Sequence, residues 1–193
     1  GLAVAIKFTS GIFAIAIGVL LLWRLYSGQT RWSQALLFGA AAVLATVLGT
    51  GAWSWWLWRS FGNPVYPLFN SLFGSPFAPS GPTVALRFLP DGAFGLLSRL
   101  WEMADIRAYT TTEAFVPDLR PLAAVLLGLL LLARRLLQRA PGLTGPALRA
   151  RPDVQLALVL AVSYVAWMLS SGNARYAVGW FVAAGLLTVR LLS

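Results

Sequence analysis

The chain has 193 residues, a mean hydropathy of +0.74 and only 11% charged residues. Soluble domains carry about 25% charged residues, so this composition excludes an ordinary water-soluble protein. The net charge is +9, but the basic residues do not form a polar domain that could bind nucleic acid. We therefore expect no nucleic-acid partner. The chain has no Cys and no His, which excludes disulfides, thiolate or imidazole metal sites and His-dependent catalysis. We expect no metal site and no cofactor, with binding of a divalent metal by carboxylates left open.

Apolar stretches dominate the chain, and several approach the roughly 20 residues that a helix needs to span a bilayer. They predict an all-α fold, a polytopic transmembrane helix bundle formed by residues 1–193 as a single domain. Residues 2–6 are left open as an extension of the first span. The expected spans are residues 8–23, 34–57, 122–137, 154–169 and 176–192.

The span over residues 34–57 is rich in Gly and Ala, which predicts close approach of a neighbouring helix. It ends in a cluster of four Trp between Trp53 and Trp58, a composition typical of the membrane–water interface. Residues 59–120 then form one long polar loop whose first half is broken by prolines. Residues 91–107 predict an interfacial helix in this loop, with Asp91 as its N-cap.

The distribution of arginine predicts the orientation of the bundle. The short connectors at residues 24–31 and 134–151 are rich in Arg, and Arg190 falls on the same side by helix counting. Arginines in the long loop are balanced by an equal number of Asp and Glu. Because basic residues of short loops face the cytoplasm, we expect a multi-pass protein of the inner membrane with the loop at 59–120 on the outer side.

Five of the six acidic residues fall in the long loop. A membrane enzyme acting on the outer face would use such a carboxylate as a general base or metal ligand. For Glu102 and Asp105 a solvated helix face is the favoured interpretation, whereas Glu113 and Asp118 are open to either one. No general base is assigned.

Three basic residues are candidates for binding a phosphate at the outer face. Arg59 follows the Trp cluster, Arg175 lies in the turn after the fourth span, and Lys7 is near the outer end of the first span. A guanidinium suits phosphate because its fork of N–H donors matches phosphate oxygens. The alternative for the two arginines is anchoring to anionic headgroups, and for Lys7 it is snorkelling to the interface. Topology predicts that these residues share one surface.

Residues 53–67, WSWWLWRSFGNPVYP, resemble the segment P-W-x-x-R-N-x-x-x-x-G-N-P-x-x-P of bacterial polytopic glycosyltransferases of the GT-C superfamily. This superfamily includes protein-mannosyltransferase-like and aminoarabinose-transferase-like enzymes. Residues 172–176, GNARY, resemble the R-Y-x-x-P element of the same proteins, and residues 6–11, IKFTSG, are similar to T-K-x-T-G. The elements follow the family's order over about residues 5–180. Ser60 and Val178-Gly179 depart from the pattern.

The resemblance implies transfer of a sugar from a polyprenyl-phosphate donor to an acceptor at the outer face of the bacterial inner membrane. The family's catalytic carboxylate lies in an earlier loop, so no residue here corresponds to it. We therefore expect the chain to be the later part of a longer protein, one that supplies the donor-phosphate site. The implied phosphate-binding residues are Lys7, Arg59 and Arg175. The residues expected to shape the loop are Gly62, Asn63, Pro64, Tyr66 and Pro67.

Two other functions are compatible with the sequence. The chain could be a non-catalytic accessory transmembrane subunit, with its aromatic cluster and small-residue helix as surfaces for other membrane subunits. It could also be an O-antigen polymerase or ligase-like protein, a class that likewise uses arginines at the outer face. The expected partners are membrane lipid, a lipid-linked sugar donor and, for the accessory subunit, a larger membrane complex.

Overall fold

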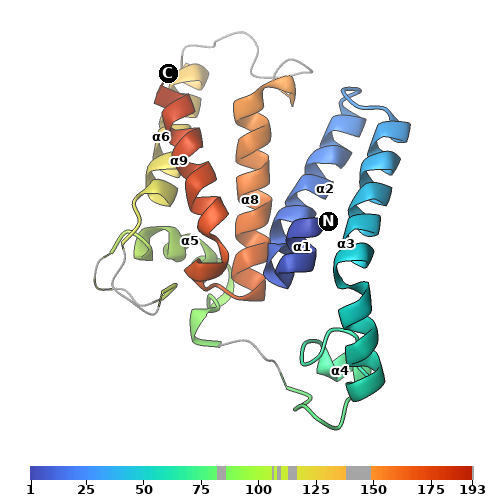
Figure 1. The fold of residues 1–193 in the computed structure, drawn as a ribbon. Coiled ribbons are helices and arrows are strands. Elements are labelled where there is room, and N and C mark those ends of the chain that lie inside the picture. Colours follow the sequence, from blue (N-terminus) through green and yellow to red (C-terminus); the bar gives the residue numbers. More distant parts are fainter. Residues whose placement is uncertain (82–85, 106, 108–109, 113–116, 138–148, 193) are drawn as a thin grey trace. The chain divides into compact units, whose positions relative to one another are not determined.

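The computed structural model describes residues 1–192 except 82–85, 106, 108–109, 113–116 and 138–148 (Figure 1). Within these ranges the regular structure is entirely helical, which confirms the predicted all-α class. The chain divides into two compact units. The first unit comprises residues 1–11 and 33–85, and the second comprises residues 12–32 and 86–193.

Three helical segments of the described chain are long and apolar enough to cross a membrane: Phe8–Tyr26, Trp32–Phe61 and Pro152–Ser170. They correspond to the first, second and fourth expected spans. The third and fifth expected spans are also helices, α6 (Arg120–Leu137) and α9 (Val178–Leu192). Their described apolar parts are shorter, so spanning by these two stays a prediction.

The first unit is built on α3 (Trp32–Phe61), a helix of 30 residues. At 1.5 Å per residue it is about 45 Å long, more than the roughly 30 Å hydrocarbon core of a bilayer. The predicted end at Leu57 was therefore too early, because the helix continues through Arg59 to Phe61. Arg59 consequently belongs to the last turn of α3 and not to the polar loop.

Helix α1 (Leu2–Ile6) and the 3₁₀ turn η1 (Phe8–Ser10) are separated by Lys7, whose backbone is extended. The segment lies against small residues of α3. A Cβ atom on Gly49 would lie 2.6 Å from the Cβ of Ala5. Residues 2–6 are thus a separate helix packed on α3 in the first unit, not a continuous extension of the first span.

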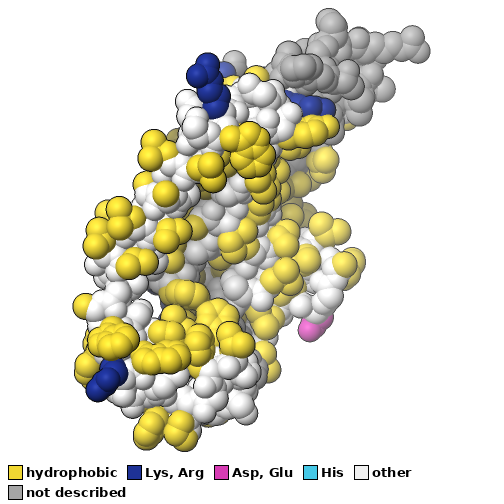
Figure 2. All heavy atoms as spheres, turned by 90° about the vertical axis from the view of Figure 1, so that its right-hand side faces the viewer, with side chains coloured by type: hydrophobic (Ala, Val, Ile, Leu, Met, Phe, Trp, Pro, Cys, Tyr) yellow, Lys and Arg dark blue, Asp and Glu magenta, His cyan; other side chains and the backbone are white. Residues whose placement is uncertain are grey.

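Exposed apolar side chains follow α3 along its length, and Figure 2 shows hydrophobic side chains covering much of the face of the molecule on which this helix lies. Leu37, Leu48 and Trp55 are examples with more than half of their surface exposed. So much exposed apolar surface is costly in water but is the expected surface of a helix in lipid. The surface therefore supports a membrane-embedded protein.

The second unit packs α9 against both α6 and α8 (Pro152–Ser170). Its core is aromatic: Trp167 and Trp180 lie 6.0 Å apart between ring centroids, and Phe181 contacts both rings. The indole N–H of Trp180 donates to the carbonyl of Leu160, 2.8 Å away. Ile12 of α2 (Gly11–Tyr26) joins the same core.

A short helix, α5 (Gly92–Glu102), lies across the lower part of the second unit (Figure 1). Asp91 occupies the predicted N-cap position, but its side chain makes no capping hydrogen bond. Its carbonyl instead accepts the N–H of Gly95. The expected helix over 91–107 is therefore shorter, ending at Glu102.

Candidate functional site

The chain turns sharply directly after α3. Gly62 adopts a φ of +68°, a left-handed conformation that favours glycine. Asn63 follows and is fully buried. Its Oδ1 accepts the N–H of Val65 at 3.0 Å, and its Nδ2 donates to the carbonyl of Leu68 at 2.8 Å. One buried amide therefore ties together both sides of the turn.

Aromatic contacts complete the turn. The ring of Tyr66 stacks on that of Phe61, with 4.2 Å between centroids, and its hydroxyl donates to the carbonyl of Phe77 at 2.7 Å. The peptide bond between Tyr66 and Pro67 is cis. Pro64 lies within the turn segment. All five loop-shaping candidates thus belong to one ordered bend that holds the chain against the end of α3.

Replacing Asn63 with alanine should loosen this bend. The change removes two hydrogen bonds and leaves the Leu68 carbonyl and the Val65 N–H without these partners, which costs about 1–3 kcal/mol. We expect faster proteolysis within residues 62–79 of the protein in bilayers, measured by timed digestion and mass spectrometry. Ser60→Ala is the matched control, since Ser60 is exposed on the last turn of α3. Equal cleavage rates for the two variants would contradict the role of the buried amide.

The basic candidates of the first unit are both exposed. Lys7 lies at the junction of α1 and η1, and Arg59 lies in the last turn of α3, three residues before Gly62. Among the residues that the structure describes, the side chain of Arg59 makes no hydrogen bond or ion pair. Its guanidinium is therefore available to an anion at the end of a candidate membrane span.

Arg175 lies in the second unit, in the 3₁₀ turn η3 (Ala174–Tyr176) between α8 and α9. Buried neighbours fix this turn. The side chain of Asn173 accepts the N–H of Arg175 at 3.1 Å, and the N–H of Ala174 donates to the carbonyl of Thr111 at 2.7 Å. The guanidinium of Arg175 lies over the ring of Tyr176 and donates to its hydroxyl at 2.8 Å. A rigid turn thus presents an exposed cation.

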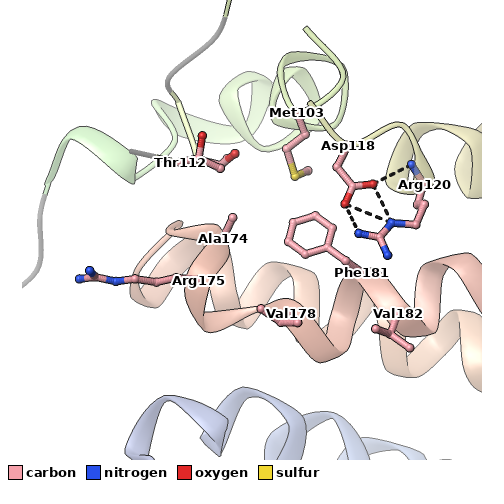
Figure 3. A pocket seen from close by; sticks show the side chains of 10 residues that line it. Met103, Thr112, Asp118, Arg120, Ala174, Arg175, Val178, Phe181 and Val182 are labelled. Atoms are coloured by element: carbon pink, nitrogen blue, oxygen red, sulfur yellow. Dashed lines mark hydrogen bonds and ion pairs between the residues drawn. The ribbon is translucent and has the colours of Figure 1, made fainter. Parts of the chain in front are cut away.

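A pocket of about 270 Å³ adjoins this turn (Figure 3). Figure 3 shows the side chains of Met103, Asp118 and Phe181 converging on it, whereas the guanidinium of Arg175 extends away from its centre. The lining residues are Met103, Thr111, Thr112, Asp118, Arg120, Ala174, Arg175, Val178, Phe181 and Val182.

Asp118 and Arg120 form the charged wall of the pocket. Arg120 Nε donates to both carboxylate oxygens of Asp118, at 2.9 and 3.1 Å, and Nη2 donates to Oδ2. The N–H of Asp118 is fixed by the carbonyl of Met103 at 2.7 Å. The paired guanidinium neutralises the carboxylate and occupies its oxygens, so Asp118 is poorly placed as a general base. These contacts therefore favour a structural role for Asp118 over a catalytic one.

The sequence interpretation missed Arg120 and Phe181 as parts of a site. Arg120 lies 5.7 Å from the centroid of the Phe181 ring. The two are separated by about sixty residues in the chain, so no local pattern joins them. The ion pair itself could have been predicted from the sequence. Asp118 and Arg120 are only two residues apart at the start of a helix, so their side chains can reach each other.

The other loop carboxylates also have local partners. Glu102 accepts hydrogen bonds from Ser98 Oγ and Arg99 Nη1, each at 2.7 Å. Partial burial pushes the pKa of Glu102 upward, but these hydrogen bonds and the charge of Arg99 outweigh it, and the pKa lies below its usual value. Asp105 accepts the N–H of Arg107. Glu113 lies outside the described residues.

These contacts favour structural roles for Glu102 and Asp105. Within the described chain no group of three or more His, Cys, Asp or Glu side chains could hold a metal ion.

The three predicted phosphate-binding residues are thus divided between the units. Lys7 and Arg59 belong to the first unit and Arg175 to the second, so a shared surface stays a prediction. No family model, curated protein or solved structure matches the chain.

Proposed function

We propose that the chain belongs to a membrane glycosyltransferase of the GT-C type, in which it binds the phosphate of a polyprenyl-phosphate-linked sugar donor. Arg175 is the candidate phosphate contact of the second unit, and Arg59 and Lys7 are the candidates of the first unit. The sugar would pass to an acceptor at the outer face of the inner membrane. The resemblance of the Gly62–Pro67 bend and of the Arg175 turn to family elements supports this assignment.

The observation that carries the proposal is an exposed apolar stripe on α9 that begins at the pocket beside Arg175. Val178 and Val182 line that pocket, and Leu186 and Val189 continue the stripe along the same helix. Spacings of three and four residues place these side chains on one helix face. A cation at one end of an apolar stripe suits an amphiphile with an anionic head and a long hydrocarbon chain.

The role proposed for these residues is to stabilise the phosphate that leaves during sugar transfer. When the bond between the anomeric carbon and the donor phosphate oxygen breaks, negative charge develops on the phosphate. The guanidinium of Arg175, which an ordered turn positions, would stabilise that charge with little reorganisation. The Asn173 side chain and the Thr111 carbonyl hold the Arg175 turn in place. The chain would therefore stabilise the leaving group, and the activating carboxylate would come from elsewhere.

Binding of a polyprenyl phosphate to the protein in nanodiscs tests the proposal. Arg59→Ala and Arg175→Ala should each weaken binding by about 10-fold or more, since a hydrogen bond to a charged group contributes about 1.5–3 kcal/mol. Arg31→Ala and Arg190→Ala are matched controls. Arg31 immediately precedes α3 and Arg190 lies at the end of α9, each at the helix end opposite its candidate.

The corresponding polyprenol, which lacks the phosphate, should bind weakly to all of these variants. Unchanged phosphate binding in both Arg59→Ala and Arg175→Ala would remove the phosphate site. That result would favour the accessory subunit, for which these arginines only anchor the chain to headgroups. Loss of binding in the two control variants as well would show a nonspecific effect of net charge.

A further inference from the structure

Helix α5 presents an exposed apolar face. Phe94, Leu97 and Trp101 are 82%, 70% and 68% exposed. They are spaced by three and four residues, so their side chains share one side of the helix. These three residues are here called the α5 apolar face. In water such a continuous patch on an 11-residue helix would be unfavourable.

The opposite side of α5 is buried, which fixes the rotation of the helix about its axis. Leu96 and Leu100 pack against the aromatic core of the second unit. Arg99 is only 7% exposed, and it donates from Nη1 to Glu102 and from Nη2 to the carbonyl of Leu89 at 3.0 Å. Turning the helix to hide its apolar face would expose this core side and break the bond between the buried guanidinium and the Leu89 carbonyl.

The depth of α5 is set by a hydrogen bond to α8. The hydroxyl of Tyr164 donates to the carbonyl of Leu96 at 2.6 Å. Helix α8 has 19 residues, about 28 Å, which nearly equals the hydrocarbon thickness of a bilayer. Tyr164 lies six residues, about 9 Å, before the end of α8 at Ser170. Figure 1 accordingly shows α5 beside α8 and not beyond its end.

We propose that α5 lies within the membrane, at the boundary between headgroups and acyl chains, with its apolar face inserted into lipid. A helix tied to a candidate span at this depth has lipid, not water, as its surroundings. Phe94, Leu97 and Trp101 on one face match the composition of helices that lie at the interface. This inference depends on α8 spanning the bilayer and not on the proposed glycosyltransferase activity.

The absence of cysteine from the sequence allows a clean test. Spin labels on Leu97→Cys and Phe94→Cys, in separate full chains, are measured in vesicles of phosphatidylethanolamine and phosphatidylglycerol. Collisions with oxygen report the acyl region, and collisions with a water-soluble nickel chelate report the aqueous phase. Asp91→Cys is the matched control, because Asp91 is exposed at the N-cap of the same helix and makes no capping bond through its side chain.

We expect both labels on the apolar face to collide several-fold more with oxygen than with the nickel chelate, and the label at residue 91 to show the reverse. High collision with the nickel chelate at residues 94 and 97 would place α5 in water and overturn the proposal. Low collision with both reagents would mean that another protein subunit covers the face, which also overturns it. Because the two substituted positions are exposed, each variant should keep the helix content of the parent protein by circular dichroism.

Discussion

Replacing Gly172 with alanine is expected to destabilise the second unit by about 3 kcal/mol or more. A Cβ atom at this position would lie 2.0 Å from the carbonyl oxygen of Phe88, far inside van der Waals contact. The residue also has a φ of +60°, which alone costs a residue with a side chain about 1–2 kcal/mol. The opposing group is backbone and cannot rotate away, so one of the two segments must move.

The measurement is unfolding in detergent micelles followed by circular dichroism. Gly28→Ala is the matched control, because Gly28 also has positive φ, +69°, but a Cβ there would meet no atom within 4 Å. The difference between the two variants isolates the overlap with Phe88 from the backbone strain. Equal destabilisation would contradict the close approach of these two segments.

Replacing Trp167 with alanine is the second change with a large expected effect, about 3–5 kcal/mol. The side chain is fully buried among Tyr164, Trp180 and Phe181. Its indole N–H donates to the carbonyl of Asn173 at 2.9 Å. Alanine would leave a cavity at the centre of the aromatic core and release the turn that carries the exposed arginine.

Trp167→Phe separates the two parts of this effect. It keeps an aromatic ring but loses the hydrogen bond to Asn173, so its destabilisation should be clearly smaller than that of the alanine variant. Trp32→Ala, which removes an exposed indole at the start of α3, should change the midpoint of unfolding little. Equal midpoints of unfolding for Trp167→Ala and Trp32→Ala would contradict the central position of Trp167.

These two stability changes should also lower phosphate binding, since both disturb the turn at Asn173–Tyr176. Arg175→Ala differs from them, because its exposed side chain can be removed without opening the core. We therefore expect it to reduce binding without shifting the unfolding midpoint. That contrast distinguishes a residue that contacts the ligand from residues that only position it.

Much of the helical architecture could be predicted from the sequence. In lipid no water is present to bond to the backbone, so a long apolar run satisfies its N–H and C=O groups by forming a helix. The residues 34–57 and 154–169 were expected as spans and form α3 and α8. Helix ends were less predictable. Arg59 was placed in a loop, yet α3 continues through it to Phe61.

Composition and apolar patterning by themselves determined that this is an all-helical, membrane-type chain with a sharp turn at Gly62–Pro67, because burial of apolar surface and backbone restrictions act locally. Tertiary structure alone decided which distant groups surround the charged side chains. It placed the Asp118–Arg120 pair beside Phe181 and buried Arg99 of α5. It also tied Leu96 to Tyr164, 68 residues away in sequence. Such contacts depend on how distant segments pack, and no local periodicity encodes that packing.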